Sequence, residues 1–170
     1  MSKSSKAISP LIQSILFLII ALAIVGVTFQ LGLPYIQKLE DLKAFEQGKE
    51  LIIEIDGIIN KIQLNEISGR ELLVNLNKGS LVIDDSNDFV QYEVPAVLGV
   101  LEEGFYSEEG NVYLRRLGTA RVGFQSNDIN IITETAGVTR ISPGTYTLQI
   151  DYNGSDASGN IKVRFRVKQS

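Results

Sequence analysis

The sequence predicts an α+β protein, in which one long N-terminal helix precedes an all-β sandwich domain, called the head below. Residues 7–37 are mostly apolar and carry no charged side chain. From residue 39 to residue 62 apolar residues recur at steps of three and four, which is the helical period. Beyond residue 67 the pattern changes to short alternating segments separated by turn-rich pieces, which is typical of strands in a sandwich.

Composition excludes several classes of chemistry. The 170 residues contain neither cysteine nor histidine, and the net charge is −4. Disulfide scaffolds, thiol catalysis, Ser-His-Asp catalysis and histidine-ligated zinc are therefore excluded. The negative charge argues against nucleic acid as a partner, because phosphate binding needs clustered cations. We expect no enzymatic activity, no catalytic residue, no cofactor and no resident metal.

The apolar run is long enough to cross a membrane. About 20 apolar residues span the roughly 30 Å hydrocarbon layer, and residues 8–33 exceed that length. Lys3 and Lys6 precede the run, and lysines on a short flank favour a cytoplasmic N-terminus. Everything after Pro34 would then lie outside the cell.

Three interpretations of the run are open. A secretory signal peptide is one, because Ala21-Leu22-Ala23 matches the small-residue cleavage pattern, although cleavage there leaves a hydrophobic new terminus at Ile24. A plain transmembrane anchor is the second, and periodicity alone does not exclude it. The third is a helix that is held by the membrane and later packs against copies of itself.

The N-terminal flank favours the third interpretation. The stretch "SKAISPLI" resembles the class III signal peptide of archaeal type IV pilins and archaellins. The resemblance implies cleavage by a prepilin peptidase between Ala7 and Ile8. Two positions depart from the pattern: Ala7 stands where glycine is common, and the fifth mature residue is Ile12 where bacterial pilins carry glutamate. The second departure is usual among archaeal members.

The helix is expected to continue past the apolar run. Residues 35–65 read as an amphipathic continuation, kinked near Gly32 and Pro34, with Gly48 interrupting the apolar stripe. The resemblance implies a filament-core helix at 8–34, after a leader at 1–7 and before a head at 68–170. We assign the contacts of that core to one series of helix positions: Ile12, Leu16, Ile19, Ala23 and Val27.

Eight segments read as strands, and the segment 95–103 reads as a strand or a loop. They are residues 71–76, 80–84, 89–94, 111–116, 120–124, 129–135, 145–152 and 161–167. The stretch "SPGTYTLQI" resembles the strand entry of many immunoglobulin-like domains, which implies that topology for the head.

The last predicted strand carries a row of cations. Lys162, Arg164, Arg166 and Lys168 alternate with apolar residues and therefore share one face. Two interpretations are open: the row binds an acidic surface of a neighbouring subunit, or it protects an edge strand from sheet-to-sheet association.

Three polar features are weighed against simpler explanations. Asp84, Asp85 and Asp88 suit either an ordinary hairpin turn or a calcium site. Asn153 begins an Asn-Gly-Ser triplet in a predicted turn, which is either a glycan acceptor or a chance occurrence. Paired carboxylates occur in glycosidases, but no aromatic platform is evident beside the pairs here, so we expect a solvated acidic loop. The carboxylates are Glu102, Glu103, Glu108 and Glu109.

The leading hypothesis is a subunit of an archaeal type IV pilus-like surface filament. Its partners would be copies of itself, the prepilin peptidase, a membrane assembly platform and the membrane before assembly. The alternative is an anchored surface protein that does not polymerise, whose head binds an S-layer or envelope partner, as accessory proteins of the archaellum do.

Overall fold

The computed structural model describes residues 10–95, 104, 106–109, 111–117, 119–126, 128–134 and 137–169. These residues form one long helix and two β-sheets, which confirms the α+β class with a sandwich-like head. The chain divides into two units, Met1–Leu39 and Glu40–Ser170. The helix α1 runs from Pro10 to Gln63.

The strands follow α1 in the order of the sequence. They are β1 (Gly69–Leu76), β2 (Ser80–Asp84), β3 (Phe89–Pro95), β4 (Tyr106–Glu109), β5 (Val112–Leu117), β6 (Thr119–Gln125), β7 (Ile129–Thr133), β8 (Val138–Ile141), β9 (Gly144–Ser155) and β10 (Ile161–Gln169).

Helix α1 continues through Pro34 and ends in a left-handed cap. Pro10 occupies the first turn, where the missing amide hydrogen costs nothing. At the other end Asn65 has a φ of 56°, and the amide of Glu66 donates to the carbonyl of Lys61 at 2.9 Å. This arrangement satisfies carbonyls of the last turn that would otherwise lack a partner.

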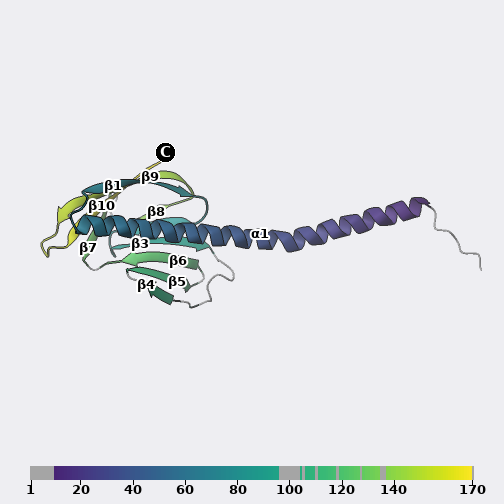
Figure 1. Ribbon diagram of the computed structural model, residues 1–170, viewed down its shortest axis with the longest axis horizontal. Coiled ribbons are helices and arrows are strands. Elements are labelled where there is room, and N and C mark those ends of the chain that lie inside the picture. Colours follow the sequence, from purple (N-terminus) through teal and green to yellow (C-terminus); the bar gives the residue numbers. More distant parts are fainter. Residues whose placement is uncertain are drawn as a thin grey trace, which may run out of the picture. The chain divides into compact units, whose positions relative to one another are not determined.

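The head contains two sheets (Figure 1). One has the strand order β1-β9-β10-β7 and the other has the order β4-β5-β6-β3-β2-β8. Neighbouring strands are antiparallel except for β7 and β10, which pair in parallel from Ile129↔Ile161 to Thr133↔Phe165. Because β10 lies between β9 and β7 as far as Phe165, Lys162 and Arg164 lie on an interior part of the strand, and the edge-protection interpretation is wrong for them.

The C-terminal half of α1 supplies one wall of the head's core. Its buried side chains repeat at steps of three and four, as the periodicity predicts, and they form one cluster with the inner faces of both sheets. Ile52, Ile55 and Ile59 are fully buried there. The partners from the sheets include Tyr92 and Phe124 on one side and Ile150 and Phe165 on the other. The helix is therefore part of the head from about Ala44 onward.

Tyr92 also fixes the turn by which the chain passes from the four-stranded sheet to the six-stranded sheet. Its hydroxyl donates to the carbonyl of Lys78, in the turn between β1 and β2. The ammonium of Lys78 in turn forms an ion pair with Asp41 of α1. The turn is thus held from the six-stranded sheet and from the helix at once.

All eight predicted strands occur, with ends that differ by at most three residues. Two further strands, β4 and β8, lie outside them. Each has only four residues, too few for alternation to stand out, and β4 contains the acidic residues that we expected in a loop. The segment 96–103, with Glu102 and Glu103, lies outside the described residues.

Candidate functional site

The N-terminal part of α1 presents apolar side chains on all sides. Every large hydrophobic residue described between Ile12 and Leu39 is exposed in the single chain, from Ile20 at 48% to Leu31 at 73%. The apolar window of the helix has a mean hydropathy of 2.6. By length and composition α1 can cross a membrane.

The hydroxyl groups in this segment are satisfied within the helix itself. Ser14 donates to the carbonyl of Pro10 at 3.0 Å, and Thr28 donates to the carbonyl of Ile24 at 2.8 Å. A hydroxyl that bonds back to the preceding turn needs no water. Both residues therefore suit apolar surroundings, whether lipid or other helices.

The five positions assigned to a filament core share one face of α1. Their steps of four, three, four and four residues keep them within one stripe at 100° per residue. Ile12, Leu16, Ile19 and Val27 are each more than half exposed. The residues of the expected leader, Lys3, Lys6, Ala7 and Ile8, lie outside the described residues.

The cation row on β10 lies on the outer face of the four-stranded sheet, and its members differ. Val163 and Phe165, between them, are buried in the core. The Nη1 atom of Arg166 lies 3.5 Å from Oδ2 of Asp151, and its Nε atom lies 3.7 Å from Oε1 of Glu134. Lys162 and Lys168 have no ion pair with another residue of the described part. The row is thus partly neutralised within its own sheet.

Asn153 lies near the end of strand β9, although the sequence suggested a turn. The strand continues to Ser155, and the turn begins at Asp156. The side-chain oxygen of Asn153 accepts a hydrogen bond from Arg164, and the residue is half-buried. Glycosylation of its amide nitrogen stays a prediction.

The aspartates between β2 and β3 hold a turn. Asp84 accepts bonds from the backbone amides of Ser86 and Asn87 at 2.9 and 3.1 Å, and from the Asn87 side chain at 2.9 Å. The Asn87 side chain is the main cause that lowers the pKa of Asp84, the two backbone amides act the same way, and burial opposes them.

The other two carboxylates of this turn hold the following strands. Asp85 binds the hydroxyl of Thr133 and the amide of Gly137, and Asp88 binds the amide of Ile131. Each carboxylate therefore has protein donors. The bonds of Asp84 are those of the hairpin-turn interpretation, whereas Asp85 and Asp88 tie the turn to β7 and to Gly137.

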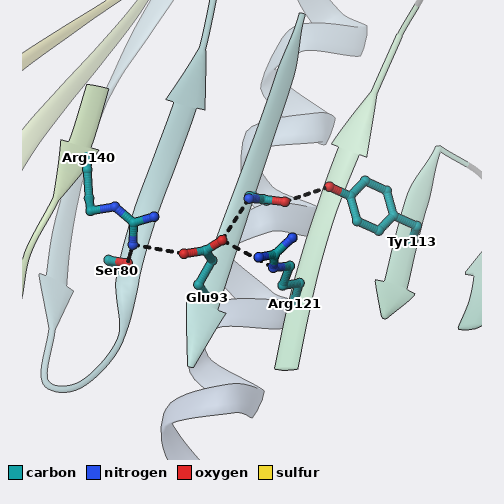
Figure 2. Close-up of polar contacts among 6 residues, drawn as sticks. Ser80, Glu93, Tyr113, Arg121 and Arg140 are labelled. Carbon is teal, nitrogen blue, oxygen red and sulfur yellow. Dashed lines mark hydrogen bonds and ion pairs between the residues drawn. The ribbon is translucent and has the colours of Figure 1, made fainter. Parts of the chain in front are cut away.

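A polar network on the outer face of the six-stranded sheet was not anticipated from the sequence. Figure 2 shows the carboxylate of Glu93 between two guanidinium groups. Oε1 of Glu93 lies 3.2 Å from Nε of Arg121, and Oε2 lies 2.8 Å from Nη1 of Arg140. Glu93 is only 8% exposed although its face is the outer one. Pairing on both sides makes this burial tolerable.

The network extends along the sheet through a buried amide. Gln91 donates to Oε1 of Glu93 at 2.9 Å and accepts from the Tyr113 hydroxyl at 3.0 Å, while Arg140 also donates to Ser80 at 2.8 Å (Figure 2). These residues come from β2, β3, β5, β6 and β8, so only the strand register brings them together. The alternation of Gln91 and Glu93 with buried residues in β3 is the one local signal for it.

Neither a protein-family model, nor a curated protein, nor a solved structure matches this chain.

Proposed function

We propose that this chain is the structural subunit of an archaeal type IV pilus-like surface filament. The observation that carries the proposal is the apolar N-terminal part of α1, whose side chains are exposed on every side in a single chain. Such a surface needs a covering of lipid or protein, because roughly 25 cal/mol is lost for each Å² of apolar area left in water.

A membrane supplies the first covering and other copies of the helix supply the final one. Lipid chains are as apolar as leucine side chains, so the transfer from lipid to a helical bundle involves little change in hydrophobic free energy. Close packing of many helices then stabilises the filament. The internally bonded hydroxyls of Ser14 and Thr28 suit either environment.

The continuity of α1 supports assembly over simple anchoring. The same helix that carries the apolar segment also supplies Ile52, Ile55 and Ile59 to the core of the head. Because the C-terminal part of α1 is packed in the core of the head, a pulling force on the filament passes directly from the helix to the head. An anchor attached by a loose linker would serve equally well for a surface protein that does not polymerise.

The N-terminus of the native protein tests processing. Mass spectrometry of the protein isolated from its own cells should find a terminus at Ile8. A terminus at Met1 or Ser2 would contradict the proposal and favour the anchored surface protein with an S-layer or envelope partner. A terminus at Ile24 would contradict it in favour of a secreted domain.

A further inference from the structure

The outer face of the six-stranded sheet contains an open hollow of about 320 Å³, called the outer-sheet hollow below. It lies beside the Glu93 network and is lined by side chains from β3, β4, β5 and β6. Its aromatic lining consists of Phe89, Tyr106 and Tyr113. Aromatic walls with a few fixed polar groups are the usual composition of a small-molecule site.

Close packing of the strands beside the hollow depends on a glycine at position 123. Gly123 lies in β6 between Tyr113 of β5 and Gln91 of β3. A Cβ atom there would lie 2.6 Å from the carbonyl oxygen of Val90 and 2.7 Å from Cβ of Gln91. Backbone cannot yield to such a contact, so the glycine allows β3 to lie this close to β6.

The polar groups of the hollow are held in place from behind. The Tyr113 hydroxyl donates to Gln91, and Gln91 donates to the buried carboxylate of Glu93. A tyrosine hydroxyl keeps its proton at neutral pH, and burial raises the pKa of Tyr113 further. A site whose polar atoms are already oriented spends little free energy on ordering when it binds a ligand.

Two like charges lie side by side at the hollow, and the carboxylate of Glu108 lies near them, hydrogen-bonded to Tyr106. The pairing of β5 with β6 sets Arg115 directly opposite Arg121. Directly opposed like charges destabilise a sheet. Glu93 compensates Arg121 but is shared with Arg140, and Arg115 has no ion pair with any described residue. An anionic group between the two guanidiniums would relieve the repulsion and accept their donors in forked geometry.

From these features we infer that the outer-sheet hollow binds a saccharide unit that carries a carboxylate. The carboxylate lies between Arg115 and Arg121, and the carbon-hydrogen face of the sugar ring packs on Tyr106, which is 58% exposed. Sugar hydroxyls reach Tyr113 and Gln91. The volume fits one or two sugar rings, so a uronic acid within a glycan chain is the chemical class that uses the arginine pair, the Tyr106 ring and the oriented polar groups together.

The test uses the full-length chain, unassembled in micelles of a zwitterionic detergent without a sugar headgroup. The probe is trigalacturonate, titrated with saturation-transfer NMR. Saturable binding is expected, and Arg115→Gln should weaken it about tenfold because a forked charge-assisted contact is lost. Tyr106→Ala should weaken it about fivefold through the loss of ring stacking. Arg70→Gln, an exposed arginine of the four-stranded sheet, is the matched control and should leave the affinity unchanged.

Three results would overturn the inference. They are no binding of trigalacturonate, equal affinity of the wild-type and Arg115→Gln chains, and equal affinity for the neutral galactose trimer. Acetate that displaces the probe at the same carboxylate concentration would overturn the saccharide part, since it would show that the carboxylate alone is recognised. Tyr106 and Arg115 are exposed, so both variants should keep the far-UV circular dichroism spectrum and the thermal unfolding midpoint of the wild type. The measurement needs no filament, so its outcome is independent of the proposed assembly.

Discussion

The ring of Tyr92 packs directly on the backbone of α1 at Gly48. A Cβ atom at position 48 would lie 1.9 Å from Cδ1 and 2.3 Å from Cε1 of that ring. The glycine that interrupts the apolar stripe of the helix is therefore the place where the helix admits the largest buried side chain of β3. This contact joins α1 to the six-stranded sheet inside the head.

Gly48→Ala should destabilise the head by about 2 kcal/mol, because the added methyl group must displace the ring of a packed core. The matched control is Gly57→Ala in the same helix, where nothing lies within 4 Å of an added Cβ. That substitution should stabilise the head by about 0.5–1 kcal/mol, since alanine favours helix over glycine. Thermal unfolding of the full chain in micelles, followed by the near-UV tyrosine signal, measures both. Equal effects of the two substitutions would refute the contact.

Ala23→Phe should reduce the filament yield several-fold while the chain remains in the membrane. The added ring lies on the face assigned to the filament core, and overpacking an interface of helices costs about 1–3 kcal/mol per site. Ala21→Phe is the control, since it makes the same change about 200° around the helix. Filaments sheared from cells are quantified against total chain by immunoblot. If Ala21→Phe is the more harmful of the two, the assignment of Ile12, Leu16, Ile19, Ala23 and Val27 is wrong.

Lys168→Glu should weaken filaments without changing the stability of the head, if the cations of β10 bind a neighbouring subunit. Lys168 is exposed and has no ion pair with a described residue. Arg166→Glu should lower both the filament yield and the stability of the head. The loss of its pairs with Asp151 and Glu134 should cost the head about 0.5–1 kcal/mol. Filament yield and thermal unfolding are measured side by side. Undiminished filaments from Lys168→Glu would mean that the row is a solvated face.

Acid should destabilise the head partly through Asp84. Its pKa is lowered in the folded protein, so its contribution is complete above about pH 4 and is lost as the pH falls through the folded value. Asn87→Ala removes the main cause of the shift and should flatten the loss of stability below pH 4. Asn75→Ala, an exposed asparagine of β1, serves as the control. Denaturant unfolding between pH 2.5 and pH 7 gives the slope of the free energy of unfolding against pH. Identical slopes for the wild type and Asn87→Ala would contradict the role of Asn87 in lowering the pKa of Asp84.

Periodicity predicted the parts of the fold that depend on residues close together in the sequence. The helix was predictable because residues 8–33 form one long apolar run and apolar residues recur at the helical period from Leu39 to Ile62. The last hairpin was predictable because Val163 and Phe165 alternate with cations. A four-residue strand such as β8 offers too few residues for a period to emerge. The role of Gly48 was hidden as well, since a glycine reads as a weak helix residue until its neighbour in space is known.

The candidate sites on the head depend on register, which the sequence does not state. Phe89, Tyr106 and Tyr113 form an aromatic lining only because β3, β6, β5 and β4 lie side by side. The sequence offered no sign of that aromatic platform. Likewise Glu93 meets Arg121 and Arg140 across separations of 28 and 47 residues. Pairings of this kind are set by tertiary structure, and the alternation in β3 indicates that Glu93 faces outward without indicating its partners.

The most direct test of the account is the protein content of filaments sheared from the cells that produce this chain. If the chain is a filament subunit, electron micrographs should show thin filaments, and mass spectrometry should find this chain among their components. Its apolar helix segment should be protected from protease until the filaments are dissolved in detergent. Recovery of the chain solely from the membrane fraction, with the sheared filaments free of it, would contradict the account.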